Sequence, residues 1–214
     1  MSVTIIIIIL TCIISVTAFS NPKIIDDLIF YPPAIDRQKQ WYRFFTNGFI
    51  HADIGHLAFN MLSLYLFGDL VEKAFGDIFG IKGKLIYILL YVIALAVCLI
   101  PTYSKNKENY YYKSLGASGA VSAVIFAGIL LFPLTKIYLF FIPIGIPGFI
   151  FGPIYLFVSA YLSKKGGDNI NHSAHIWGAL FGVAYLVVLC YALSDFKPVQ
   201  HFIEDIQSFF SGSN

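Results

Sequence analysis

Long apolar runs, separated by short polar segments, fill most of the chain. Charge-free runs occur at Val3–Asn21, Ile54–Gly68, Leu85–Ser104, Ser114–Thr135, Ile137–Ser163 and Asn169–Ser194. A helix needs about 20 mainly apolar residues to cross a bilayer, and in lipid only helices or closed barrels satisfy the backbone polar groups. The pattern predicts an all-α polytopic membrane protein with six transmembrane helices in one domain, residues 1–194.

Two of these runs should depart from a plain apolar helix. The second run is short and carries His56, Asn60 and Ser63. Polar groups at membrane depth are costly, so this helix should be buried among the others. The fifth run is rich in proline and glycine. Residues Pro143–Pro153 should therefore be irregular or kinked, with the regular helix following.

The two ends of the chain are interpreted separately. Met1–Phe19 has no basic residue before Lys23, which favours a first membrane span over the alternative of a signal peptide. In the tail, residues 195–214, five apolar residues recur at helical spacing: Phe202, Ile203, Ile206, Phe209 and Phe210. This spacing predicts a short amphipathic helix on the membrane surface, and a frayed tail is the alternative.

Composition supports a membrane protein. The chain is 58% hydrophobic and only 12% charged, whereas soluble domains carry about 25% charged residues. A net charge of +2 without a basic block argues against nucleic acid as a partner. Cys12, Cys98 and Cys190 lie inside apolar runs without metal-ligand spacing, which fits small apolar residues better than a disulfide framework.

An even number of crossings brings three polar clusters to one side of the membrane. With six spans, both termini share one side, and the starts of the second, fourth and sixth spans share the other. His51 and His56 open the second span, Ser118 opens the fourth, and His172 and His175 open the sixth. The span count thus predicts that these side chains meet at similar depth.

Ser118 is the candidate nucleophile. It lies between Gly116-Ala117 and Gly119-Ala120, and small neighbours leave room for an acyl group to approach. At the first turn of a helix, free N–H groups and the helix dipole favour a developing oxyanion. The alternative is a serine that packs helices among small residues.

His175 is the candidate general base, since a serine hydroxyl reacts only when a neighbouring base takes its proton. Ala174, Gly178 and Gly182 form one small-residue face, and Gly119, Ala123 and Ala127 form another. Small residues let membrane helices approach closely, which favours contact between His175 and Ser118. A packing histidine is the alternative.

His56 and Asn60 are candidate oxyanion donors. They are four residues apart and share one helix face, and such donors stabilise a transition state that gains charge. The alternative is a polar pair that joins helices. Asp53 and Asp168 are loop residues expected to be solvated, so the sequence predicts a Ser–His dyad.

Other intramembrane protease chemistries do not fit the sequence. There is no His-Glu-x-x-His motif for zinc, and no two runs carry an aspartate each. The sequence calls for no metal and no cofactor.

These residues together resemble the rhomboid family of intramembrane serine proteases. The resemblance rests on segments around Trp41–Thr46, His51–Asn60, Val71–Gly76, Gly116–Gly119 and Ala174–Gly182. Each motif is weak alone, but their order and placement are specific.

The resemblance implies a compact six-helix bundle with an active site sunk below the membrane surface. It implies a serine endopeptidase that cleaves single-span membrane proteins, with membrane protein substrates and lipid as partners. It also implies an oxyanion hole from His56, Asn60 and the Ser118 N–H, and a first loop anchored by Arg43 and Glu72.

Three observations depart from the family pattern. Ser122 stands where an aromatic residue usually stacks on the histidine, and Tyr42 stands where a tryptophan is common beside the arginine. The resemblance places the site on the non-cytoplasmic side of the cell membrane. With that orientation five basic residues lie inside and nine outside, the reverse of the positive-inside rule.

Two other functions stay open. The first is a non-catalytic rhomboid-like protein that binds membrane clients, although such a protein has no reason to keep Ser118, His175, His56 and Asn60 together. The second is a small transporter, which would carry polar residues at the middle of several spans. For a protease, the irregular fifth segment and Ser163–Asn171 are candidate gates.

Overall fold

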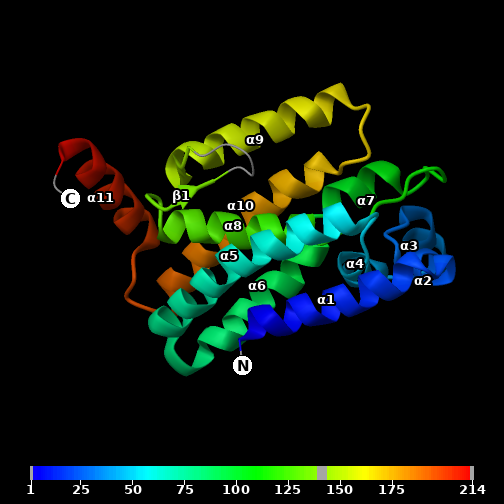
Figure 1. Cartoon of the computed structure of the whole chain (residues 1–214), viewed down its shortest axis with the longest axis horizontal. Helices are drawn as coiled ribbons and strands as arrows, with labels where there is room; N and C mark the ends of the chain where they lie inside the picture. The colour runs from blue at the N-terminus through cyan, green and yellow to red at the C-terminus, as the bar shows by residue number, and fades with distance from the viewer. Residues whose placement is uncertain (1, 139–143, 213–214) are drawn as a thin grey trace.

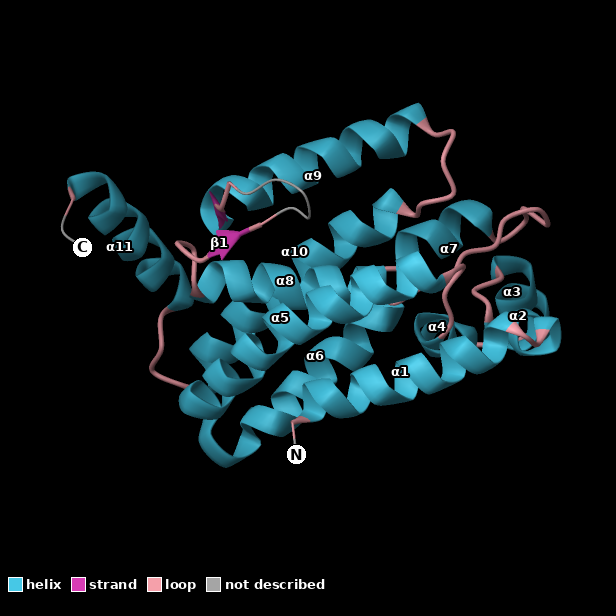
Figure 2. Cartoon of the chain, viewed as in Figure 1, coloured by secondary structure: helices cyan, strands magenta, loops and turns pink. Residues whose placement is uncertain are grey.

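The computed structural model describes residues 2–138 and 144–212, and this part of the chain is almost entirely helical (Figure 2). The long helices are α1 (Val3–Phe19), α5 (Ile54–Phe79), α6 (Gly83–Val97), α8 (Ser118–Leu131), α9 (Gly148–Lys165) and α10 (His172–Leu193). The other helices are α2 (Pro22–Leu28), α3 (Pro32–Gln38), α4 (Arg43–Thr46), η1 (Asn47–Phe49), η2 (Gly80–Lys82), α7 (Ile100–Asn106) and α11 (Pro198–Ser211). The all-α class is confirmed.

Length and apolarity support some of the predicted crossings. The helical segment Ile54–Asn106, which contains α5, α6 and α7, and the helix His172–Leu193 are long and apolar enough to span a bilayer. Val3–Phe19 and Ser118–Leu131 are apolar but shorter. Six crossings therefore stay a prediction.

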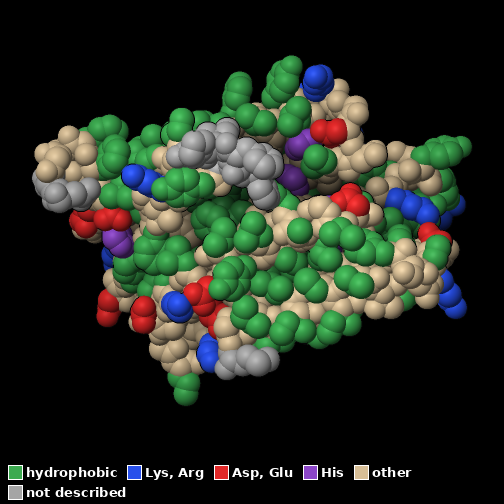
Figure 3. Space-filling model, in the orientation of Figure 1, with side chains coloured by type: hydrophobic (Ala, Val, Ile, Leu, Met, Phe, Trp, Pro, Cys, Tyr) green, Lys and Arg blue, Asp and Glu red, His purple; other side chains and the backbone are tan. Residues whose placement is uncertain are grey.

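Helix α8 lies at the centre of the bundle (Figure 1). It packs on α5, α6, α9 and α10, while α1 packs on the outer side of α5. Twelve of the 14 residues of α8 are buried. Around it, hydrophobic side chains cover the visible surface, and charges gather towards the two ends of the long axis (Figure 3). This distribution is what a bilayer around the helices requires.

The closest contact in the bundle joins α8 to α10 through their small-residue faces. A Cβ on Gly178 would overlap the Gly119 carbonyl oxygen, and one on Gly182 would overlap the Ala123 carbonyl oxygen. The two backbones touch because neither glycine has a side chain. The predicted close approach of these faces is confirmed.

Helix α5 extends beyond its charge-free run. It continues from Gly68 to Phe79 and includes Glu72, which is buried. The Glu72 carboxylate accepts hydrogen bonds from the Val3 and Thr4 amides at 2.8 and 2.9 Å. It thereby satisfies free N–H groups at the start of α1, which offsets the cost of its burial.

Glu72 therefore does not anchor the first loop, and that assignment was wrong. The Val71–Gly76 motif placed the carboxylate on the second long helix, but it did not indicate that the carboxylate faces the start of α1. Arg43 does lie within the loop, where its Nη1 donates to the carbonyl oxygens of Asp26 and Ile29 at 2.8 and 2.7 Å. The loop is also joined to the segment before α8 by a backbone bridge between Phe30 and Ser114.

The fifth run becomes helical earlier than predicted. Strands β1 (Lys136–Ile137) and β2 (Ile146–Pro147) pair antiparallel, and α9 begins directly afterwards at Gly148. The expectation of irregular structure is wrong for residues 148–153, and Pro143 lies outside the described residues. Pro153 is tolerated because it removes only one hydrogen bond near the beginning of α9.

The tail forms helix α11, so the alternative of a frayed tail is wrong for residues 198–211. Phe209 and Phe210 lie against Phe149 at the start of α9, with ring centroids 5.6 and 6.1 Å away. Its position on a membrane surface stays a prediction.

Candidate active site

A turn built on Gly116 presents Ser118 at the start of α8. Gly116 has a φ of +113°, and a Cβ there would lie 2.7 Å from Cε1 of His56. Only glycine suits both the conformation and the contact. The Gly116 amide donates to the Asn47 carbonyl oxygen at 2.9 Å, which holds the turn against the first loop.

The structure brings Ser118 and His175 into contact. Ser118 Oγ lies 2.8 Å from Nε2 of His175, and with Nε2 unprotonated the serine hydroxyl donates. Ser118 is the first residue of α8, and the α-helical bonds begin with Val121 N–H to the Ala117 carbonyl. The N–H of Ser118 therefore has no acceptor within its own helix, as at any helix start.

The helices that carry the candidate histidines, α10 and α5, each begin at a residue whose side chain caps the helix. Asn171 Oδ1 accepts the Ala174 amide at 3.1 Å, at the start of α10. Asp53 Oδ1 accepts the His56 amide at 2.8 Å, at the start of α5. Asp53 is an exposed residue before α5, as expected, and it also caps that helix.

Asp168 is also bonded, although it lies in an exposed loop. Its Oδ2 lies 2.9 Å from Nε2 of His172, and that hydrogen bond lowers the pKa of the Asp168 carboxyl below its usual value. The His172 ring in turn meets His175 edge to face, with centroids 5.7 Å apart. Asp168 thus orients the neighbour of His175.

His51 connects the turn before Ser118 to α1. It is fully buried, with Nδ1 at 2.9 Å from Ser15 Oγ and Nε2 accepting the Ala117 amide at 3.4 Å. Ser15 Oγ donates its proton to the Phe49 carbonyl, so the network assigns the proton of His51 to Nδ1. Burial, and then the nearby His56, lower the pKa of His51 to about 3, so this imidazole is neutral.

His56 and Asn60 lie on the same face of α5 but differ in their contacts. The His56 ring packs beneath Gly116 and meets His51 edge to face at 5.0 Å between centroids. Asn60 is buried, and its Nδ2 donates to the His56 carbonyl oxygen at 3.1 Å. His56 thus lies at the turn that presents Ser118, while the Asn60 amide is engaged within α5.

Sequence comparison gives the family. A model of the rhomboid domain matches residues 38–192, which is most of the chain. The chain belongs to the rhomboid family. Members are integral membrane proteins, and the two long apolar helical segments of this rhomboid agree with that.

Similar curated proteins come from bacteria and from plant organelles. RHOMBOID-like protein 12, mitochondrial, of Arabidopsis thaliana is 33% identical over 63% of this chain and 42% of its own length. Putative rhomboid protease YdcA of Bacillus subtilis is 30% identical over 71% of this chain and 68% of its own. Rhomboid protease GlpG of Haemophilus influenzae is 26% identical over 75% and 77%. The match also spans about half the length of Rhomboid-like protein 11, chloroplastic, of Arabidopsis thaliana.

The structure of this rhomboid supplies an aromatic ring that the sequence seemed to lack. Tyr155 of α9 stacks on His175, with centroids 6.2 Å apart and an interplanar angle of 26°. Its hydroxyl lies 2.8 Å from Oγ of Ser122. Tyr155 was not predicted from the sequence, because the pattern of apolar residues in α9 does not indicate which face of this helix packs on α10.

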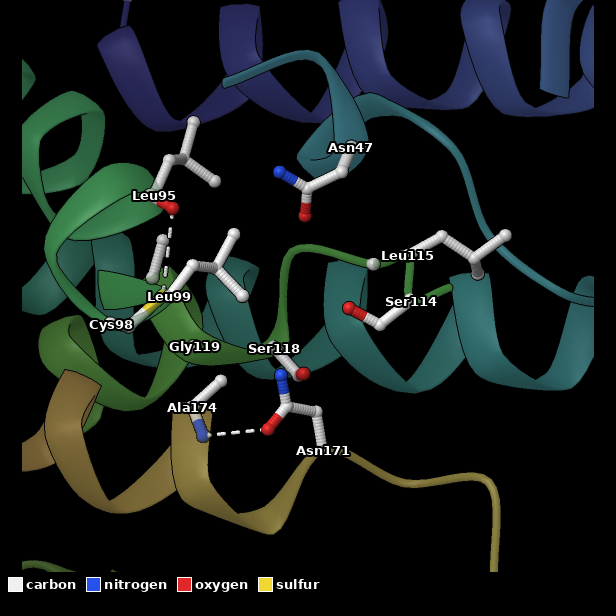
Figure 4. A pocket seen from close by; sticks show the side chains of 12 residues that line it. Asn47, Leu95, Cys98, Leu99, Ser114, Leu115, Ser118, Gly119, Asn171 and Ala174 are labelled. Atoms are coloured by element: carbon white, nitrogen blue, oxygen red, sulfur yellow. Dashed lines mark hydrogen bonds between the residues drawn. The ribbon is translucent and has the colours of Figure 1, made fainter. Parts of the chain in front are cut away.

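A small cavity of about 20 Å³ adjoins Ser118 (Figure 4). Its polar lining comes from Asn47, Ser114 and Asn171, which belong to three separate segments of the chain. A cavity of this size is about that of one water molecule. Ser118 therefore adjoins a small space that is lined by both polar and apolar side chains, including Leu95 and Leu99.

Proposed function

We propose that this rhomboid is an intramembrane serine endopeptidase with Ser118 as nucleophile and His175 as general base. The observation that carries the proposal is the 2.8 Å contact between Ser118 Oγ and His175 Nε2. The two residues are 57 positions apart and lie on different helices. A hydrogen-bonded pair of nucleophile and base is the arrangement that nucleophilic catalysis needs.

The reaction follows from this contact. His175 Nε2 takes the hydroxyl proton while Oγ forms a bond to the carbonyl carbon of the scissile peptide. The tetrahedral intermediate then expels the amine, which takes the proton from His175 as the C–N bond breaks. Water, deprotonated by His175, hydrolyses the acyl-enzyme and restores Ser118.

The developing oxyanion is stabilised at the start of α8. The Ser118 N–H has no acceptor within its own helix and is free to donate to the oxyanion. The positive end of the α8 dipole lies at the same position and favours negative charge there. We assign His56 as a second donor, since its ring packs at Gly116. Asn60 is the third, and its role requires the amide to turn from the His56 carbonyl.

The substrates are single-span membrane proteins, reached within the cell membrane, with the site open to the non-cytoplasmic side. The apolar surface around the bundle supports a substrate that arrives through lipid. Residues 1–194 form the catalytic six-helix domain, and α11 lies at the membrane surface.

Covalent labelling tests the proposal directly. The purified protein in detergent is treated with a fluorophosphonate, and labelling is followed by gel fluorescence and mass spectrometry. We expect modification at Ser118, its loss in Ser118→Ala, and a decrease of at least about 10³-fold in His175→Ala. Cleavage of a single-span reporter in proteoliposomes should follow the same order.

The same experiment separates the protease from a client-binding protein. A folded Ser118→Ala variant that still cuts the reporter would exclude the serine mechanism. A folded wild type that neither reacts nor cuts, but retains the reporter in pull-down, would favour the binder. The intact hydrogen-bonded pair is the observation that favours the protease.

A further inference from the structure

Tyr155 of α9 contacts His175 of α10 and Ser122 of α8, and so touches both helices that carry the Ser118–His175 pair. Its ring lies almost parallel to the His175 ring at 6.2 Å between centroids. Its hydroxyl is 2.8 Å from Ser122 Oγ, one turn after Ser118 on α8. One side chain of α9 thus contacts the base directly and reaches the helix of the nucleophile.

The direction of the hydrogen bonds follows from the number of protons. Ser122 Oγ donates its only proton to the Ser118 carbonyl oxygen at 2.8 Å. Ser122 can therefore only accept from Tyr155, whose hydroxyl donates. The result is a chain of bonds from Tyr155 through Ser122 to the backbone of the nucleophile.

The Tyr155 ring is fixed from its other sides as well. Phe126 of α8 and Phe151 of α9 lie at 5.5 and 5.8 Å between centroids. Ser122, which accepts the hydrogen bond from the Tyr155 hydroxyl, is buried. With hydroxyl and ring both constrained, Tyr155 presents its flat face to His175 in one orientation.

His175 needs such support. In a serine protease triad a carboxylate fixes the plane and tautomer of the imidazole, but Asp168 bonds His172 instead. Rotation of a histidine ring about its second side-chain torsion is soft. A stacked aromatic ring restricts this rotation and holds Nε2 towards Ser118.

The geometry points to Tyr155 as the positioning residue of His175, with Ser122 as its anchor. This inference rests on the proposed protease function and deepens it. The serine at position 122 is small enough to admit the ring and supplies its acceptor, so the stacked ring comes from α9 and not from position 122 of α8. The pair is therefore aligned for reaction only while α9 is docked on α8 and α10.

Removing the ring gives the main test. Tyr155→Leu should lower kcat for reporter cleavage, and the rate of fluorophosphonate labelling, by about 10- to 100-fold, because misplaced reacting groups lose rate steeply. KM should stay within about twofold, since the ring does not hold substrate. Tyr161→Leu is the matched control, an exposed tyrosine on the same helix, and should react like wild type.

Smaller changes isolate the anchor. Tyr155→Phe keeps the ring but loses the hydroxyl bond, and Ser122→Ala loses the acceptor, so each should lower kcat by about 3- to 10-fold. The double variant should lose no more than either single one, because both remove the same bond. Ser122→Tyr combined with Tyr155→Ala returns a ring to α8, and it should recover part of the rate lost in Tyr155→Leu.

The outcomes separate this inference from the proposed function. Wild type that reacts at Ser118, together with Tyr155→Leu of unchanged kcat, overturns the positioning role and leaves the protease intact. If Tyr155→Leu does not fold, the Phe and Ser122 variants decide, and unchanged kcat in both overturns the role. Wild type without reactivity overturns both proposals.

Discussion

Helices α8 and α9 both approach the candidate site, but the bundle surrounds them very differently. Twelve of the 14 residues of α8 are buried, against three of the 18 residues of α9. α8 carries Ser118 and packs on α5, α6, α9, α10 and α11, whereas α9 packs mainly on α10 and α8 and meets α11 at Phe149. Figure 1 shows α9 on the outer side of the bundle.

This difference in burial suits α8 and α9 to two different roles. The nucleophile that we propose must be held in place, and the burial of α8 and its backbone contact with α10 hold the helix that begins at Ser118. In the proposed protease, an element that admits a substrate from lipid needs few contacts, because regions with few buried contacts open at low free energy. Tyr155 joins the two, since it lies on the loosely packed helix and contacts the histidine.

The largest expected effect concerns the tightly packed helix α8 and its contact with α10. Gly178→Ala places a methyl group on the Gly119 carbonyl oxygen, and two backbones cannot yield as a side chain can. We expect a loss of stability on the order of 3 kcal/mol or more, measured by thermal unfolding in detergent, and loss of labelling at Ser118.

Gly76→Ala is the matched control. A Cβ at Gly76 meets nothing within 4 Å, and alanine stabilises a helix interior over glycine by up to about 1 kcal/mol. If the two variants unfold at the same temperature, the contact of α8 with α10 does not dominate stability.

An intermediate effect depends on pH and concerns the turn before α8. The folded pKa of His51 is about 3, below its ordinary value of 6.5, so the unfolded chain binds more protons between these values. Stability is therefore fully present above pH 6.5 and is lost as pH falls towards 3, by up to about 1.4 kcal/mol per pH unit. Chemical unfolding at pH 7, 6 and 5 measures this slope.

His51→Asn removes this titration. The variant should be less stable than wild type at pH 7, because Ser15 and Ala117 lose their partner. Its stability should also depend less on pH between 7 and 5. An identical slope in both proteins would mean that other groups carry the pH dependence.

The smallest expected effect concerns the loosely packed helix α9. Phe157 of α9 is 75% exposed, so Phe157→Ala should change stability in detergent by less than about 0.5 kcal/mol. Phe75→Ala on α5 is the comparison, since that ring is fully buried and its removal should cost about 3–5 kcal/mol. A large effect at Phe157 would show that α9 is held by contacts beyond those of its buried face.

Patterns within single segments were predictable from the sequence. The apolar runs predicted the long helices, because a lipid-exposed backbone has no alternative to a helix here. The small residues around Gly178 and Gly182 predicted close contact with α8, because no other residue allows it. Ser118 and His175 were identified from these local motifs.

Contacts between segments were not predictable in the same way. The family resemblance led us to assign Glu72 to the first loop, but its carboxylate accepts the first amides of α1. This error concerns a polar side chain whose partners lie on another helix. The partner depends on the rotation and depth of helices, which residue spacing does not encode.

The sequence by itself determined that this is a helical membrane protein with a serine and a histidine at small-residue helix faces, since composition and periodicity act along one chain segment at a time. Tertiary structure alone decided that Ser118 Oγ and His175 Nε2 lie 2.8 Å apart, and that Tyr155 rather than residue 122 provides the ring. Those facts depend on how three helices pack, and packing is settled by the fit of all their side chains together.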